Sequence, residues 1–239
     1  KPMPHIGSIM ASLEERQVFD SVERIRYPYD PYEALKAVEA IGRRLNPRFV
    51  IDDENRFAYL NFIRWMHADP DFQCIDPESG QVVAGDLLKG LYIAGSPGTG
   101  KTWLMSLMCN YSRAMGFRIN FPAYEKTERR DLAWPSLHAE DICESYLRSG
   151  SIADFAGSPM IAIQDMGAER RETVYMGNRV DVVRLLIEKR ADLPCKITLA
   201  TSNMKMQGEV LRARYGDKVY SRMRQMFNYL ELKGRDRRK

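Results

Sequence analysis

The chain has 239 residues, 44% of them hydrophobic and 28% charged, which is enough to bury a full core as one main domain with an appendage. No apolar run approaches the ~20 residues that span a bilayer and no secretory signal is visible, so we expect a cytoplasmic protein without a membrane partner. Four cysteines and three histidines are scattered along the sequence, which argues against a disulfide framework and a structural zinc site. The net charge of +4 does not by itself imply nucleic acid.

Residues 1–48 predict a small N-terminal helical extension. Apolar residues recur there at helical spacing twice, first at Val18, Val22 and Ile25 and then at Leu35, Val38, Ile41 and Leu45. Asp30 suits the N-cap of the second helix, and Pro31 suits its first turn. A further helix is expected from Asp52-Asp53, with an apolar side that packs onto the following domain. The stretch DPESGQVVAGD after it is typical of a loop.

From residue 90 onward, short apolar runs alternate with helical stretches. The predicted strands are Gly90–Ala94, a segment near Asp131–Ser136, Met160–Ile163, Lys196–Thr201 and Tyr229–Leu232. The predicted helices lie near Lys101–Met115, Ala139–Ser149 and Arg179–Asp192. Strands separated by helices indicate a parallel, doubly wound α/β sheet.

The stretch GSPGTGKT matches the phosphate-binding pattern GxxxxGK[ST] completely, with a strand before it and a helix after it. Its glycines permit a tight path that turns several amide N–H groups toward one anion, and the helix adds its positive end. In such a loop Lys101 reaches the β- and γ-phosphates, and the Thr102 hydroxyl binds Mg²⁺. The predicted nucleotide-binding residues are Gly95, Ser96, Pro97, Gly98, Thr99, Gly100, Lys101, Thr102 and Trp103, the last of which also suits packing.

Two later apolar runs end in polar residues, where a P-loop protein needs an acid for its metal and a group that orients water. In MIAIQDMGAE the run ends at Gln164 and Asp165, and this is the only candidate for the acid. In LATSN the run ends in Thr201, Ser202 and Asn203. Taken alone, the second stretch would be a turn or a helix cap. The order and spacing of the three stretches together are far more specific.

The succession GSPGTGKT, IQDMGAE, TSN and YGDKVYSRM, ending in GRDRR, resembles the AAA+ ATPases of the helicase-loader group, which are DnaC-like and DnaI-like loaders together with IstB-like transposition helpers. The resemblance covers roughly residues 85–239 and implies an AAA+ P-loop domain over 49–239. It also implies a five-stranded parallel sheet with helices on both faces, and ATP and Mg²⁺ bound at a subunit junction. The partners it implies are single-stranded DNA, a replicative helicase or a transposase, and further copies of this chain in an ATP-dependent homo-oligomer.

The resemblance also assigns roles to single residues. Lys101 and Thr102 match the Walker A pair, and Asn203 matches the sensor 1 position. Arg222 falls where the family has its arginine finger, which acts on the nucleotide of a neighbouring subunit. Arg238 falls where the family places its sensor 2 arginine. The physics behind both arginines is general, since a guanidinium stays charged near pH 7 and its planar fork matches phosphate oxygens.

One position departs from the family pattern of two consecutive acids. Gln164 stands in the first acid position, and a neutral amide oxygen is a poorer ligand for Mg²⁺ than a carboxylate. Asp165 would then serve the metal, the water, or both, and conversion of ATP to ADP and phosphate would be slow. Besides a loader and a transposition helper, a nucleotide-gated scaffold with little hydrolysis therefore stays open. A P-loop small-molecule kinase also stays open, since P-loops serve many chemistries.

Basic residues gather toward the C-terminus, and this distribution has two interpretations. The residues are Arg212, Arg214, Lys218, Arg222 and Arg224, followed by the stretch KGRDRRK. Such a cluster fits a solvated surface as well as an anion-binding one.

Overall fold

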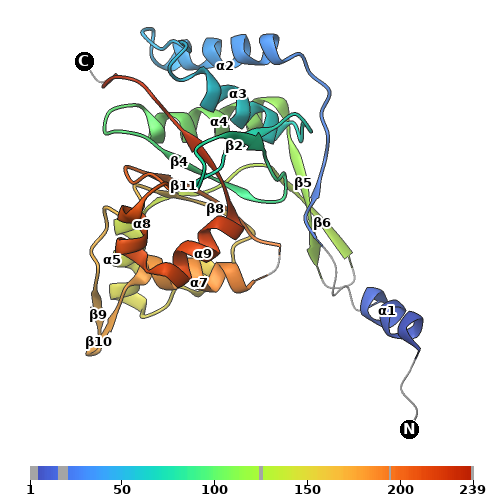
Figure 1. Cartoon of the computed structure of the whole chain (residues 1–239), viewed down its shortest axis with the longest axis vertical. Coiled ribbons are helices and arrows are strands. Elements are labelled where there is room, and N and C mark those ends of the chain that lie inside the picture. Colours follow the sequence, from blue (N-terminus) through green and yellow to red (C-terminus); the bar gives the residue numbers. More distant parts are fainter. Residues whose placement is uncertain (1–4, 16–20, 124–125, 194, 238–239) are drawn as a thin grey trace.

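The computed structural model describes residues 5–15, 21–123, 126–193 and 195–237 (Figure 1). The strands of its central sheet are β2 (Gln73–Ile75), β3 (Val82–Ala84), β4 (Gly90–Ala94), β7 (Ser136–His138), β8 (Met160–Gln164), β11 (Ile197–Ser202) and β12 (Phe227–Glu231). They are ordered β3-β2-β12-β4-β11-β8-β7. The strands from β12 to β7 run parallel to their neighbours, while β2 pairs antiparallel with β12 and β3 antiparallel with β2.

The prediction of a parallel α/β sheet is confirmed, but the expected five strands are too few. The sheet has seven, because the hairpin β2–β3 extends the parallel part. β3 lies inside the stretch DPESGQVVAGD, which the sequence predicted to be a loop. Tyr229 of β12 pairs with Ile75 of β2, so the hairpin covers an edge whose backbone groups would otherwise be open. A short hairpin of this kind leaves no strong periodic signal.

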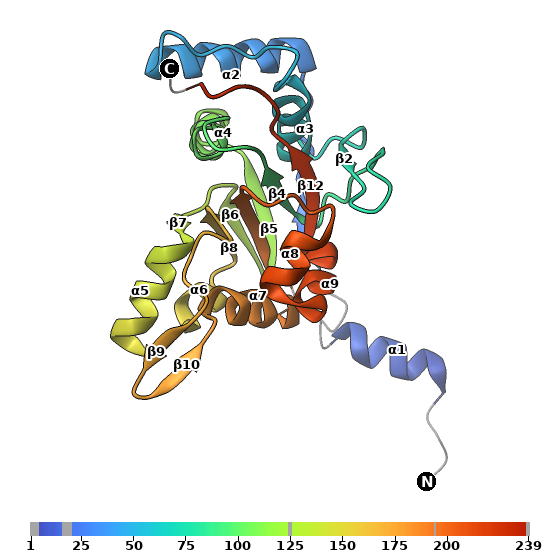
Figure 2. The same cartoon turned by 60° about the vertical axis from the view of Figure 1, so that its left-hand side comes forward.

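Helices cover both faces of the sheet (Figure 2). One face carries α2 (Pro31–Leu45), α3 (Arg56–Met66) and α4 (Lys101–Met115), and the other carries α5 (Ala139–Ser149), α6 (Ala153–Gly157), α7 (Val182–Asp192), α8 (Glu209–Tyr215) and α9 (Asp217–Met226). In β4, Leu91 and Ile93 pack into the core beneath α3 and α4, whereas Tyr92 and Ala94 pack beneath α5 and α7. Burial on both faces explains why the strand is apolar throughout.

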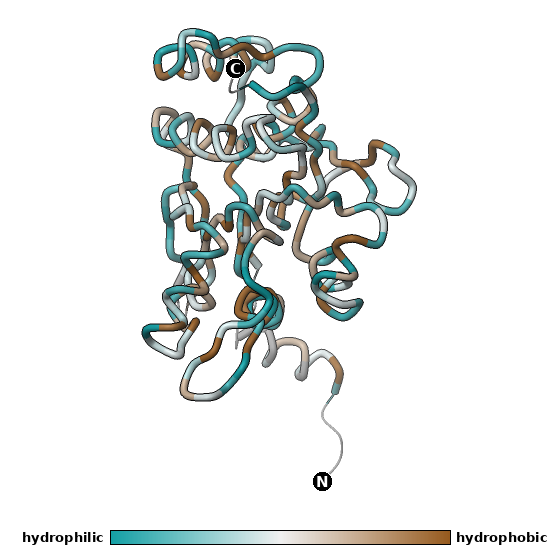
Figure 3. The backbone as a smooth tube through the Cα atoms, turned by 90° about the vertical axis from the view of Figure 1, so that its left-hand side faces the viewer, coloured by the Kyte–Doolittle hydropathy of each residue, from teal (hydrophilic) through white to brown (hydrophobic). Residues whose placement is uncertain are grey.

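The helices are amphipathic, and apolar and polar residues alternate along them in Figure 3. α2 begins as predicted, because the Asp30 Oδ1 accepts the Glu33 N–H at 2.9 Å. α3 begins at residue 56 rather than at Asp52, since the Asp52 carboxylate accepts the N–H groups of Glu54 and Asn55 in a turn before it. α2 packs on α3 and α4 and so lies against the body of the molecule.

The first predicted helix is wrong in the part that the structure describes. Val18 lies outside the described residues, and the described helix here is α1 (Ile6–Glu15). Ile25 is not helical, and the residues before it form β1 (Glu23–Arg24), which pairs with β5 (Arg118–Ala123). The Arg24 guanidinium lies 4.3 Å from the Trp65 ring centroid and donates to the Leu87 carbonyl at 3.0 Å. These contacts with distant residues override the local helical spacing.

Two further hairpins were not predicted. β5 pairs antiparallel with β6 (Lys126–Asp131). The strand expected near Asp131–Ser136 is therefore wrong, because Asp131 ends β6, Ser136 begins β7, and residues 132–135 between them form no strand. β9 (Thr173–Tyr175) and β10 (Asn178–Val180) form a second hairpin, and α7 therefore begins at Val182 instead of Arg179. Within the described ranges no helix combines the length and apolar character needed to cross a membrane.

Candidate nucleotide-binding site

The glycine-rich loop follows β4 directly and ends where α4 begins. Gly98 and Gly100 have φ of +83° and +94°, in the left-handed region that favours glycine. Gly95 is closely approached, since a Cβ built there would lie 2.5 Å from the Leu232 carbonyl oxygen. The loop therefore requires glycine at these positions. Its backbone forms the turn between a strand and a helix N-terminus that suits phosphate.

The side chain of Lys101 is almost fully buried, at 5% exposure, and points back over the loop. Its Nζ donates to the carbonyls of Gly95 at 2.8 Å and Ser96 at 3.1 Å, and to Asn203 Oδ1 at 2.7 Å. Asn203 follows β11, the strand beside β4. Because β4 and β11 are parallel, their carboxyl ends lie at one edge of the sheet, and the two predicted residues meet there. An ammonium in this position can bind an anion that approaches the loop.

Asp165 follows β8 at the same edge and lines the same cavity as Lys101 and Thr102. It has a φ of +55°, which is uncommon for a residue with a side chain, and its Oδ2 lies 3.3 Å from His138 Nδ1. The carboxylate is 41% exposed, so it is accessible from the cavity. Thr102 and Asp165 together offer hard oxygen donors, the type that Mg²⁺ prefers. His138 was not predicted here, since only its place at the end of β7 brings it to Asp165.

Gln164 has a different environment from Asp165. Its side chain is buried, at 2% exposure, and it is not among the described residues that line the cavity. Nε2 donates to Ser136 Oγ at 2.6 Å, and Oε1 accepts the Thr201 hydroxyl at 3.3 Å. Gln164 thus joins side chains of β7 and β11 across β8 in a chain of neutral hydrogen bonds.

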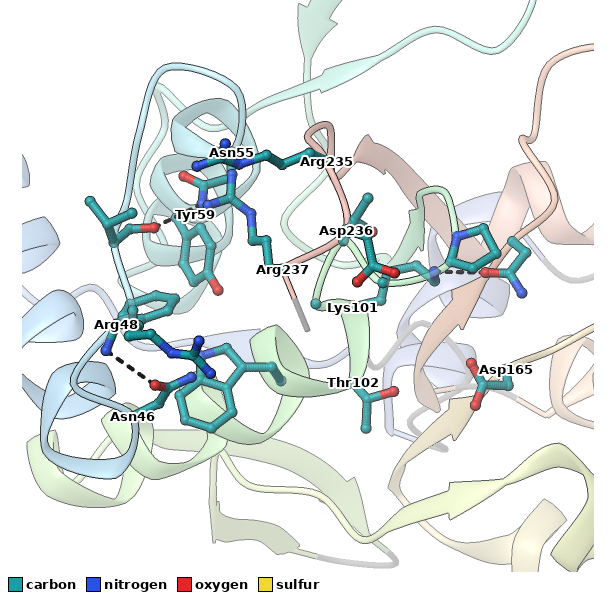
Figure 4. Close-up of a pocket in the computed structure, with 18 of the residues that line it drawn as sticks. Asn46, Arg48, Asn55, Tyr59, Lys101, Thr102, Asp165, Arg235, Asp236 and Arg237 are labelled. Atoms are coloured by element: carbon teal, nitrogen blue, oxygen red, sulfur yellow. Dashed lines mark hydrogen bonds between the residues drawn. The ribbon is translucent and has the colours of Figure 1, made fainter. Parts of the chain in front are cut away.

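The cavity beside the loop has a volume of about 1160 Å³, and besides Asp165, Ala168 and Asn203 three separate segments line it (Figure 4). The first is the P-loop with the start of α4, and the second is residues 46–50 with Asn55 and Tyr59 of the adjoining turn and helix. The third is residues 235–237. In Figure 4, Asn46 and Arg48 lie across the cavity from Asp165, with the P-loop between them. The sequence did not predict the second segment, because no motif marks it.

Two buried donors at the cavity have no hydrogen-bond partner among the described residues, namely Trp103 Nε1 and Arg237 Nε. Both side chains line the cavity, and the Trp103 ring lies 5.8 Å from the ring of Phe49. Trp103 therefore packs, as its spacing indicates, and also reaches the cavity.

Residues 233–237, which we call the strap, pass over the loop after β12. Arg237 N–H donates to the Gly98 carbonyl at 2.9 Å. The Arg237 guanidinium binds both carboxylate oxygens of Asp52, at 2.8 and 2.9 Å. Arg238, the predicted sensor 2 residue, lies outside the described residues. Arg235 and Arg237, which the sequence analysis did not single out, line the cavity instead.

Arg222 lies on α9 and does not line the cavity of its own chain among the residues described. Its guanidinium pairs with Asp192 of α7 at 2.6 Å, with 27% of its side chain exposed. Other basic residues of this region are also paired with acids: Arg214 with Glu169 and Asp181, Lys218 with Glu188, and Arg224 with Glu78. Much of the C-terminal positive charge on α8 and α9 is therefore balanced within the fold.

The chain matches no protein-family model, and no curated protein matches it by sequence. Its fold does match solved structures. A candidate primosome component from Streptococcus pyogenes serotype M3 is 19% identical, with a TM-score of 0.52 over 80% of this chain and 85% of the other. The DnaC helicase loader is 22% identical, with a TM-score of 0.51 over 79% of this chain and 96% of the other. The resemblance predicted from the motifs is thus confirmed at the level of the fold, which is similar to the folds of these two proteins.

Proposed function

We propose that this chain is an ATP-binding DNA-replication protein of the helicase-loader type, which holds Mg·ATP in the cavity beside the P-loop. The observation that carries the proposal is the position of Lys101, whose Nζ lies 2.7 Å from Asn203 Oδ1 in a cavity that Thr102 and Asp165 also line. A lysine, a threonine hydroxyl, a carboxylate and a polar amide at one sheet edge are the groups that phosphoryl-transfer sites use.

The groups would have different tasks once the nucleotide is bound. Lys101 would exchange its carbonyl and amide partners for phosphate oxygens, and Thr102 with Asp165 would hold the metal. When bound, Mg²⁺ would neutralise part of the phosphate charge. Asn203 would then be released from Lys101 and could orient a water molecule. Arg222 would act on a neighbouring subunit, where it must first leave Asp192.

A nucleotide-gated scaffold with little hydrolysis is a second candidate, and the surroundings of Gln164 favour it. Its side chain is tied to Ser136 and Thr201, so the first acid position contributes no charge to the metal. Asp165 would be left to serve both metal and water. ATP would then order the assembly, and turnover would be slow.

Equilibrium binding of a fluorescent ATP analogue, with and without Mg²⁺, tests nucleotide binding. Lys101→Ala should abolish binding, because it removes the cation that meets the phosphates. Asn203→Ala is the informative companion, since it should leave binding largely intact and lower turnover. Lys189→Ala, on α7 and outside the cavity, is a matched lysine control. Undiminished affinity in Lys101→Ala, in a protein that still unfolds cooperatively, would remove the basis of the proposal.

Single-stranded DNA, a replicative helicase and further copies of this chain are the proposed partners. Size measurement in the presence and absence of ATP tests assembly. Co-purification with a helicase or a transposase from the native cell separates the loader from the transposition helper, since both share the motifs described.

A further inference from the structure

The strap places a carboxylate on the P-loop. A Cβ built on Gly98 would lie 2.3 Å from both Cγ and Oδ1 of Asp236, and 2.8 Å from its Oδ2. The Asp236 carboxylate therefore contacts the loop backbone at Gly98 from the cavity side, and Figure 4 draws it in the same part of the cavity as Lys101. An acid here is unexpected, because the loop is built to receive phosphates.

The strap is anchored on both sides of Asp236. Before it, the Leu232 N–H donates to the Ala94 carbonyl at 2.7 Å, at the end of β4. After it, the Arg237 N–H donates to Gly98, and the Arg237 guanidinium is held by Asp52, with Glu54 at 3.7 Å. One nitrogen, Arg237 Nη2, donates to both carboxylate oxygens, and a hydrogen bond between two charged groups is stronger than one between neutral groups. The carboxylate is thus held at the loop rather than lying there by chance.

A carboxylate at this place should oppose the binding of a nucleotide. The loop amides, the helix N-terminus and Lys101 favour negative charge, so they stabilise a resident carboxylate as they would a phosphate. A nucleotide then has to approach Asp236 with like charge, or displace it. Asp236 is exposed, so water weakens the repulsion between like charges a few ångströms apart without abolishing it.

We propose that Asp236 is a built-in anion of the phosphate site, which lowers the affinity for nucleotide and makes that affinity depend on how firmly the strap is held. This inference rests on the proposed ATP site. Asp236 then lowers the affinity most for the nucleotide with the most phosphate charge. The Asp52–Arg237 pair positions the Asp236 carboxylate at the loop.

Binding of ATP, ADP and adenosine to the wild type and to Asp236→Asn tests the inference. The substitution keeps size and removes charge, so we expect ATP to bind about tenfold more tightly, from Coulomb repulsion in partly hydrated surroundings. The gain should be smaller for ADP and absent for adenosine, which carries no phosphate. Added salt should reduce the gain for ATP, since it screens charge. Asp154→Asn, an exposed carboxyl on α6 outside the cavity, is the control and should change nothing.

Each other outcome has a definite meaning. If the wild type binds ATP and Asp236→Asn binds it equally well, the inference is wrong while the ATP site stands. If Asp236→Asn binds ATP, ADP and adenosine all more weakly, Asp236 contacts the sugar or base as a hydrogen-bond acceptor, and the inference is again overturned. If neither protein binds ATP, the proposed function fails and the inference fails with it. Binding by Asp236→Asn alone would support both.

Discussion

Replacing Gln164 by aspartate tests whether the lack of a carboxylate at this position limits Mg²⁺ binding and ATP hydrolysis. Gln164 is 2% exposed and exchanges neutral hydrogen bonds with Ser136 and Thr201. Aspartate is one methylene shorter and carries a charge, so Gln164→Asn is the matched control, with the same length and no charge. Any difference between the two variants reports the charge alone.

The expected cost of the charge can be estimated from this environment. An ionised carboxylate that leaves water loses several kcal/mol, of which hydrogen bonds from two hydroxyl groups return about 1.5–3 kcal/mol each. We expect Gln164→Asp to be less stable than Gln164→Asn by about 1–3 kcal/mol without nucleotide. For a domain of this size, that lowers the melting temperature by roughly 2–12 °C. If the carboxylate faces the metal, Mg·ATP should restore part of this loss.

Thermal unfolding with and without Mg·ATP, and ATPase rates over a Mg²⁺ titration, are the measurements. We expect Gln164→Asp to raise steady-state turnover and to reach half-maximal rate at lower Mg²⁺ than Gln164→Asn. Asp165→Asn should eliminate the remaining hydrolysis and keep ATP binding. If turnover and Mg²⁺ dependence are the same in both Gln164 variants, Asp165 performs both tasks and the idea of limited hydrolysis should be dropped.

Three further predictions concern other parts of the chain. Arg222→Ala should lower ATP turnover only in assembled protein, whereas Asp192→Asn should not lower turnover. Mixing the Arg222→Ala protein with the Lys101→Ala protein should partly rescue the rate. A lack of rescue on mixing would argue against a site shared between subunits. Burial lowers the pKa of His67, so its contribution to stability is complete above about pH 6.5 and is lost as the pH falls through the lowered pKa. His67→Gln should therefore weaken the pH dependence of the unfolding free energy between pH 7.5 and 5. Single-stranded DNA should bind in the presence of ATP, and the logarithm of its affinity should fall linearly with the logarithm of the salt concentration. The slope should correspond to only a few phosphate contacts, because most of the basic groups on α8 and α9 are paired with acids. A complete lack of binding at low salt would favour a scaffold that binds only protein.

The parts of the fold that the sequence predicted are those that short stretches determine. β4, the P-loop and α4 follow from one apolar run, one glycine pattern and one amphipathic helix. The approach of Asn203 to Lys101 follows from two parallel strands ending at one edge. The hairpins β2–β3, β5–β6 and β9–β10 are short or largely exposed, so their residues lack the apolar run that marks the central strands.

The rest of the site depends on contacts between residues far apart in sequence. Asp52 and Arg237 are separated by 185 positions, and no local pattern relates them. The direction of the Gln164 side chain is equally hidden, since a residue at a strand end can point into the sheet or out of it. The sequence motif identifies position 164 as the place of the first acid. Only the structure shows that the Gln164 side chain forms hydrogen bonds with Ser136 and Thr201.

The strap also has a consequence for the dynamics of the molecule. Docking the strap orders residues 233–237 at a cost in chain entropy, and a few contacts at the surface hold them in place. Segments of this kind open at a lower free energy than the core strands. The amide hydrogen of Arg237, bonded to Gly98, should therefore exchange with solvent long before that of Ile93 in β4. The mouth of the cavity can thus open and close many times while the sheet beneath it stays folded.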